Sequence, residues 1–162
     1  MNHLRKPYGD ANRERNRTMR ILLTGGGGYL GGWVVPVAMD RGHHVRILDR
    51  FCFLPPSVHP EALFPELSTS GNLELVRGDI RRLQEYPKIF EGVDTIIHLA
   101  GLSSDPTCDL DPEMAHDVNV ECTRELARQA IQAGVKRFVF ASTCAVYGHG
   151  VFETLDEESP SN

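Results

Sequence analysis

A run of glycines after Thr24 is the part of the sequence with the most recognisable chemistry. The run reads TGGGGYLGG from Thr24 to Gly32, and it fits both a GxGxxG register from Gly26 and a GxxGxxG register from Gly25. Glycines make a tight turn possible, and because they lack Cβ atoms the backbone N–H groups can approach a phosphate closely. When such a loop opens a helix, the N–H groups and the helix dipole bind the pyrophosphate of a dinucleotide. The residues expected to contact the pyrophosphate are Gly25, Gly28, Tyr29, Leu30 and Gly31.

An acid follows this loop at the distance that ribose binding requires. Asp49 ends the next apolar run. In dinucleotide-binding motifs the acid that binds the ribose stands about 20 residues beyond the glycines. A carboxylate there accepts hydrogen bonds from both adenosine ribose hydroxyls and repels a 2′-phosphate, so the sequence favours NAD over NADP. Arg50 argues the other way, because an arginine at this place can pair with a 2′-phosphate. The plain alternative for Asp49 is a turn residue at a strand end.

Apolar runs that alternate with helical patterns would position these residues. Strands are expected at 20–24, 44–48, 73–76, 94–99 and 137–141, and helices at 28–41, 80–90 and 112–133. Residues 51–72 hold four prolines and predict a loop with at most a short helix. Alternating strands and helices give parallel strands joined by right-handed crossovers. We therefore expect an α/β fold with a Rossmann-type doubly wound parallel sheet, its first five strands in the order 3-2-1-4-5.

Composition and charge exclude some classes of function for this protein. The chain has 162 residues, 41% of them hydrophobic and 24% charged, which is typical of one globular domain. A net charge of -5 argues against a general nucleic-acid binder. No apolar run approaches the roughly 20 residues that span a bilayer, so no membrane partner is expected. Residues 1–18 predict a disordered basic tail, with a basic arm for an acidic partner as the weaker alternative, and residues 19–162 predict the domain.

The cysteines and histidines give no sign of a metal centre. Four cysteines are scattered along the chain without a CxxC pair, and the seven histidines show no HExxH spacing. Free thiols in a reducing cytoplasm are the expected state, so we predict a cytoplasmic protein without a metal site.

Six short motifs follow one another along residues 19–162. They are Thr24-Gly25-x-x-Gly28-x-x-Gly31, Gly78-Asp79-Ile80-Arg81, His98-Leu99-Ala100-Gly101, Asn119-Val120, Ala141-Ser142-Thr143-Cys144-Ala145-Val146-Tyr147-Gly148 and Glu157-Glu158-Ser159-Pro160. In this order they resemble the motifs of the NAD-dependent nucleotide-sugar epimerase/dehydratase family, which are extended short-chain dehydrogenases/reductases. Cys122 departs from the pattern, because the family has glycine after the Asn-Val pair.

The resemblance implies roles for several of these residues. It implies that Asp79 and Ile80 cover the adenine of the cofactor. It also implies that further residues lie near the cofactor, namely Leu99, Ala100, Gly101, Asn119 and Ser142. Thr143 falls at the family's catalytic Ser/Thr, whose hydroxyl binds the sugar oxygen while hydride moves to or from nicotinamide C4. The alternative for Thr143 is a threonine that caps the end of a strand. Tyr147 belongs to the VYG motif, where packing is its expected role.

The resemblance also implies what the printed chain lacks. In the family a Tyr-x-x-x-Lys motif, the general acid/base and its partner lysine, follows the acidic-proline stretch, whereas this chain stops at Asn162. The C-terminal half that binds the nucleotide sugar follows it too. We therefore expect an incomplete Rossmann domain that, in isolation, binds NAD weakly at best and does not catalyse. Relatives dimerise through two long helices, so a homodimer is expected only with the C-terminal part present.

Three functions remain open at this point. The first is the cofactor-binding half of an NAD-dependent nucleotide-sugar epimerase, dehydratase or reductase. The second is a non-catalytic NAD-binding or redox-sensing module, which would fold and bind NAD without a downstream Tyr-x-x-x-Lys. The third is a decayed gene product, which would neither fold nor bind.

Overall fold

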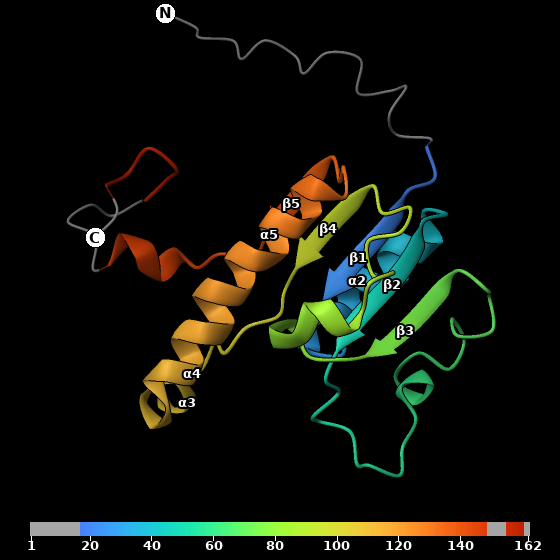
Figure 1. The fold of residues 1–162 in the computed structure, drawn as a ribbon, viewed down its shortest axis with the longest axis horizontal. Helices are drawn as coiled ribbons and strands as arrows, with labels where there is room; N and C mark the ends of the chain where they lie inside the picture. Colours follow the sequence, from blue (N-terminus) through green and yellow to red (C-terminus); the bar gives the residue numbers. More distant parts are fainter. Residues whose placement is uncertain (1–16, 149–154, 161–162) are drawn as a thin grey trace, which may run out of the picture.

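Five parallel strands form the centre of the molecule, in the order β3-β2-β1-β4-β5. The computed structural model describes residues 17–148 and 155–160. Its strands are β1 (Arg20–Thr24), β2 (His44–Asp49), β3 (Leu73–Arg77), β4 (Thr95–His98) and β5 (Arg137–Phe140), as Figure 1 shows. The predicted strand order and doubly wound arrangement are confirmed, because consecutive strands step outward from β1 and then return to its other side.

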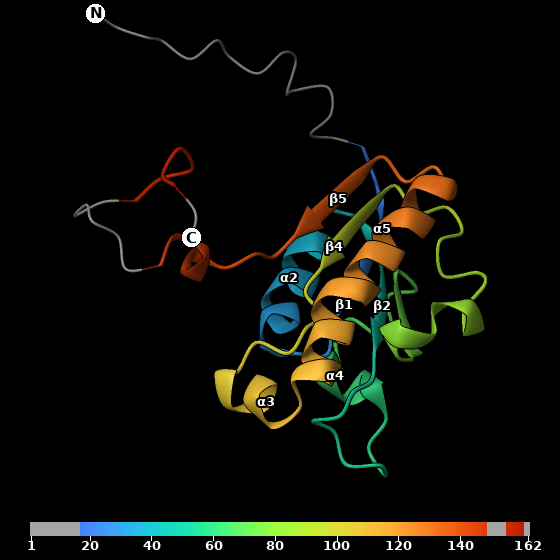
Figure 2. The same ribbon diagram turned by 60° about the vertical axis from the view of Figure 1, so that its left-hand side comes forward.

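Helices cover both faces of this sheet (Figures 1 and 2). Successive side chains of a strand point to opposite faces, so each buried strand supplies two cores. On one face Leu22 and Ile96 pack with Leu126 of α5 (Cys122–Gln132). On the other face Leu23 packs with Val35 of α2 (Tyr29–Asp40). The continuous apolar runs of the sequence are therefore the interior of a three-layer sandwich.

The predicted helix over 112–133 is only partly right. The structure divides it into α4 (Pro112–His116), a π-helical turn η3 (Asp117–Glu121) and α5, and it adds α3 (Asp105–Leu110), which was not expected. Side chains explain the π turn. The Thr123 hydroxyl donates to the carbonyl of Asn119 at 2.9 Å, and the Asn119 amide is bonded to the backbone of Leu102. Such turns inside helices are frequent at functional sites.

The predicted helix over 80–90 is also shorter and tighter than expected. It is a 3₁₀ segment, η2 (Ile80–Glu85), with a non-helical Arg82 inside it. Its first turn is held by the Asp79 carboxylate, which accepts from the Arg81 N–H at 3.0 Å. Two further 3₁₀ turns are η1 (Pro60–Leu63), inside the expected loop, and η4 (Cys144–Tyr147).

The two ends of the domain are only partly described. The predicted tail, residues 1–18, lies outside the described residues except for Arg17 and Thr18. Arg17 contacts the domain, because its guanidinium pairs with Asp94 at 3.3 Å. Beyond β5 no strand follows among the described residues, and Val139 and Phe140 are half exposed there. Within residues 17–148 and 155–160, no helix is both long enough and apolar enough to cross a membrane.

Candidate functional site

A crevice of about 470 Å³ lies where the strands β1, β2, β3 and β4 end. Carboxyl ends of strands meet at one edge of a parallel sheet, and ligands bind there at the point where the strand order reverses. The predicted site residues that line the crevice are Gly25, Gly28, Tyr29, Leu30, Asp49, Arg50, Asp79, Ile80, Leu99, Ala100 and Gly101. The structure therefore brings together residues from four loops that are far apart in the sequence.

Backbone contacts explain why the loop needs glycine. Gly25 has a φ of +76°, and a Cβ on it would lie 2.5 Å from the backbone nitrogen of Ala100. A Cβ on Gly31 would overlap the carbonyl oxygen of Gly26. Because these glycines have no Cβ, the first turn of α2 can pack directly against the loop, and the loop can pack against the backbone that follows β4. Gly31, a predicted site residue, does not itself line the crevice.

The amino end of α2 has no internal partner for its positive charge. Gly28 is the N-cap residue, and no side chain accepts a hydrogen bond from the first turn. The first turn also contains no acidic residue. The first N–H groups of a helix have no partner inside the helix, so an uncapped end suits an anion. Gly28, Tyr29 and Leu30 bring this end to the crevice.

Asp49 is held at the neighbouring strand end by two backbone N–H groups. Its Oδ2 accepts from Gly27 at 2.9 Å and its Oδ1 accepts from Phe51 at 2.5 Å. Each carboxylate oxygen has two acceptor sites, so one on each oxygen remains for another donor. The carboxylate is thus already oriented by the protein beside the glycine loop.

Phe51 is a part of this arrangement that the sequence analysis missed. Its φ of +52° is the one positive value for a non-glycine residue among those described, and its side chain is 1% exposed. Such a conformation is costly for a bulky residue and persists only where the surroundings impose it. Here the buried ring and the bond to Asp49 impose it. No local sequence pattern signals this conformation, because it depends on the buried position of the ring, and Phe51 stands at the start of a proline-rich segment that predicts only a loop.

Three charged side chains lie at the same end of the crevice. The Asp79 carboxylate pairs with the guanidinium of Arg81 at 2.6 Å and with that of Arg50 at 3.5 Å. The hydrogen bonds from Arg81 lower the pKa of Asp79, so the carboxylate stays ionised. Ion pairing therefore links the end of β2 to the loop after β3.

A buried hydrogen-bond chain, also missed by the sequence analysis, connects the loop to the π turn. Thr24 Oγ1 lies 2.5 Å from His98 Nδ1, and His98 Nε2 lies 2.9 Å from Thr123 Oγ1. The Thr123 hydroxyl donates to the carbonyl of Asn119, so its oxygen accepts from His98 Nε2–H. Nδ1 of the neutral ring then accepts from the Thr24 hydroxyl. In the motif His98-Leu99-Ala100-Gly101 the predicted cofactor contacts are the three residues after His98, so the motif gives no signal for the His98 side chain itself.

The remaining predicted site residues lie off the crevice lining. Asn119 braces the loop after β4: its Oδ1 accepts from the Leu102 N–H at 2.7 Å and its Nδ2 donates to the Leu102 carbonyl at 2.9 Å. Thr143 is the N-cap residue of η4, where its Oγ1 accepts from the Ala145 N–H at 3.1 Å. Ser142 is exposed. Direct contacts of these three with cofactor or substrate stay predictions.

Burial of His98 makes a testable prediction about acid stability. The imidazole is 1% exposed, and burial lowers its pKa from 6.5 to about 4. The unfolded chain binds a proton on this imidazole more readily than the folded chain does. The contribution of neutral His98 to the free energy of unfolding is therefore complete above pH 6.5 and is lost as pH falls towards 4. The loss should reach about 3 kcal/mol. Urea unfolding across this pH range measures it.

The matched control for this prediction is His98→Gln, which removes the titrating group. The side chains of Thr24, Thr123, Phe138 and Phe140 that contact the His98 ring carry no charge. The variant should be less stable at neutral pH and should lose less stability on acidification. An equal acid-induced loss in both proteins would show that other groups, not His98, cause it.

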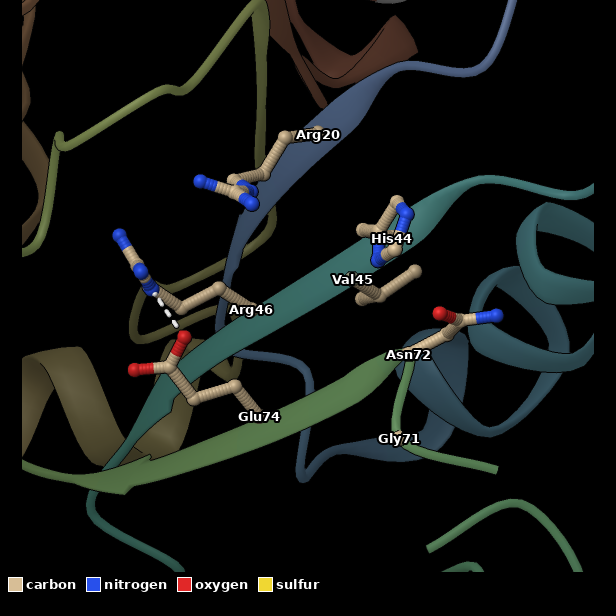
Figure 3. A pocket seen from close by; sticks show the side chains of 7 residues that line it. All are labelled: Arg20, His44, Val45, Arg46, Gly71, Asn72 and Glu74. Carbon is tan, nitrogen blue, oxygen red and sulfur yellow. Dashed lines mark hydrogen bonds and ion pairs between the residues drawn. The ribbon is translucent and has the colours of Figure 1, made fainter.

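A smaller cavity at the opposite end of the sheet offers little chemistry. It has a volume of about 140 Å³ and is lined by Arg20, His44, Val45, Arg46, Gly71, Asn72 and Glu74 (Figure 3). Arg46 pairs with Glu74 at 2.7 Å and donates to the carbonyls of Lys88 and Ile89. Its guanidinium is therefore occupied in tying β2 to β3 and to the loop before β4.

Metal binding receives no support from the part of the chain that the structure describes. Within residues 17–148 and 155–160, no group of three or more His, Cys, Asp or Glu side chains could hold a metal ion. The four cysteines are free thiols, and the one that lies at the end of the π turn, Cys122, is buried.

Comparisons of the sequence with known proteins identify a family and several relatives. The model of the NAD dependent epimerase/dehydratase family matches residues 21–162. A UDP-glucose 4-epimerase of Klebsiella pneumoniae is 34% identical over 134 residues, which are 80% of this chain and 93% of that sequence. A 3-beta-hydroxysteroid dehydrogenase of Mycolicibacterium neoaurum is 35% identical over 146 residues, which are 87% of this chain and 37% of that sequence.

A solved structure adds the three-dimensional likeness. The UDP-glucose 4-epimerase from Stenotrophomonas maltophila, solved with bound NAD and formylated UDP-arabinopyranose, superposes with a TM-score of 0.77 at 29% identity. The match covers 89% of this chain and 43% of that one. The chain thus spans less than half the length of this enzyme and of the steroid dehydrogenase. It belongs to the NAD-dependent epimerase/dehydratase family.

Proposed function

We propose that this chain binds NAD in the crevice at the carboxyl ends of the strands. The observation that carries the proposal is the uncapped amino end of α2, set beside a carboxylate that the backbone has already oriented. The glycine contacts fit the group as well, since Cβ atoms at Gly25 and Gly31 would collide with the backbone on which the loop rests.

In this proposal each part of the crevice takes one part of the dinucleotide. The N–H groups at the start of α2 bind the pyrophosphate, with Gly28 leaving room for its approach. Asp49 accepts hydrogen bonds from the adenosine ribose hydroxyls through its two remaining acceptor sites. A 2′-phosphate would bring negative charge next to this carboxylate, which is why we propose NAD rather than NADP as the preferred cofactor.

We further propose that the chain is the cofactor-binding half of a nucleotide-sugar epimerase or dehydratase. Bound NAD supplies a hydride acceptor to such a reaction. From this chain, Thr143 would offer its hydroxyl hydrogen to the sugar oxygen, because its oxygen accepts from the Ala145 N–H and its hydrogen stays free to donate. The epimerase relatives support the nucleotide-sugar class, and the steroid dehydrogenase relative shows that this half also occurs with another substrate class.

Calorimetric titration with NAD tests the cofactor proposal. We expect a single site and a rise in melting temperature that grows with NAD concentration, because a ligand that binds only the folded state stabilises it. Nicotinamide mononucleotide is the control. It lacks the adenosine and the full pyrophosphate, so it should bind far more weakly. A folded sample that shows neither heat nor a melting shift with NAD would refute the proposal.

A further inference from the structure

The adenosine end of the crevice holds two carboxylates and two guanidiniums. Asp49 ends β2 and Arg50 follows it, while Asp79 and Arg81 follow β3, and all four line the crevice. Their formal charges cancel. A third arginine, Arg77, is engaged elsewhere: its guanidinium lies 5.4 Å from the centre of the Phe51 ring, and it donates to the Arg50 carbonyl at 3.1 Å.

The Asp79 carboxylate is engaged mainly by two arginines. Its Oδ1 accepts from the backbone N–H of Arg81 at 3.0 Å and from Arg81 Nε at 3.1 Å. Its Oδ2 accepts from Arg81 Nε at 3.1 Å and Nη2 at 2.6 Å, and it pairs with Arg50 Nε at 3.5 Å. Arg81 therefore gives three N–H groups to the carboxylate, with its Nε–H shared between both oxygens, and the Arg50 guanidinium adds an ion pair. The carboxylate is thus committed to the arginines.

We propose that Asp79 helps to select NAD over NADP indirectly, by holding the guanidiniums of Arg50 and Arg81 in ion pairs and so withholding them from a 2′-phosphate. The inference rests on the proposed binding of a dinucleotide in this crevice, and it gives Asp79 a task different from covering the adenine. Guanidiniums are the groups that bind a phosphate most effectively, through two parallel hydrogen bonds. Asp49 then excludes the phosphate by repulsion, and Asp79 removes the attraction that would offset this.

The variant Asp79→Asn separates these roles. The amide keeps the size of the side chain and an oxygen that can cap η2, but it removes the charge that holds the two guanidiniums. The released charges would line the crevice beside Asp49, the proposed ribose acceptor, so the ratio of the NADP dissociation constant to the NAD dissociation constant should fall about tenfold. Calorimetric titration of each dinucleotide into the same folded sample gives the ratio, and circular dichroism melting verifies folding.

Two matched variants make the test specific. Glu85→Gln removes one carboxylate charge from the same 3₁₀ segment, where Glu85 pairs with Arg82 at 3.7 Å and does not line the crevice. It should leave the ratio unchanged. Asp79→Asn combined with Arg81→Gln should return the ratio part of the way towards that of the unmodified protein, because one of the two released guanidiniums is gone.

The outcomes distinguish this inference from the proposed function. If the unmodified protein binds neither dinucleotide, the proposed function fails. If it binds NAD but Asp79→Asn leaves the ratio unchanged, the inference fails alone. If the variant weakens both dinucleotides equally, Asp79 contacts the part that they share, which also overturns the inference. A tenfold shift with Glu85→Gln would attribute the effect to net charge and would overturn it too.

Discussion

Replacing Gly31 with alanine is expected to abolish NAD binding and to lower the free energy of unfolding by about 2 to 4 kcal/mol. The added Cβ would overlap the carbonyl oxygen of Gly26, which is backbone and has no rotamer to escape into. Helix α2 is fixed by Val35 and Ala38 in the core, so the loop must give way. Urea unfolding and NAD calorimetry on the same sample measure both effects.

The neighbouring glycine supplies the control. Gly32 lies in the same helix, and a Cβ there meets nothing within 4 Å. Gly32→Ala should leave NAD binding unchanged and raise stability by up to about 1 kcal/mol, since glycine is unfavourable inside a helix. Equal behaviour of the two alanine variants would contradict the packing explanation for the glycine motif.

The second large effect is expected at Asp49. Asp49→Asn should weaken NAD binding about 30- to 150-fold, which corresponds to about 2 to 3 kcal/mol for hydrogen bonds between the ribose hydroxyls and an ionised acceptor. The amide nitrogen also replaces one acceptor of the Gly27 and Phe51 N–H groups, so part of the loss comes from the loop itself. Titration of NAD into the folded variant measures the change.

Asp94 is a matched carboxylate away from the crevice. It accepts from the backbone N–H of Arg20 at 3.0 Å and pairs with Arg17, at the amino end of β1. Asp94→Asn should cost some stability and leave the NAD dissociation constant unchanged. If Asp49→Asn bound NAD within threefold of the unmodified protein, a figure of about 0.6 kcal/mol, Asp49 would be a plain turn residue.

Local patterns in the chain were sufficient for the sheet and for most of the crevice. Buried parallel strands are continuous apolar runs, and each run of about five residues carries its own signal. The order of the strands follows from the alternation with helices and from the glycine loop after the first strand. The position of Asp49 at the crevice could be predicted because the role expected of it depends on distance along the chain from that loop, which a sequence displays directly.

Features that join separate segments were decided only by tertiary structure. The helical period of residues 112–133 contains no sign of the π turn, because that turn depends on Leu102, in another loop, bonding to Asn119. The ion pairs of Asp79 with two arginines require β2 and β3 to end side by side, so that Arg50 reaches it. The chain from Thr24 through His98 to Thr123 likewise spans three elements. Hydrogen bonds and ion pairs are short-ranged, so partners distant along the sequence are chosen by the fold and leave no local trace.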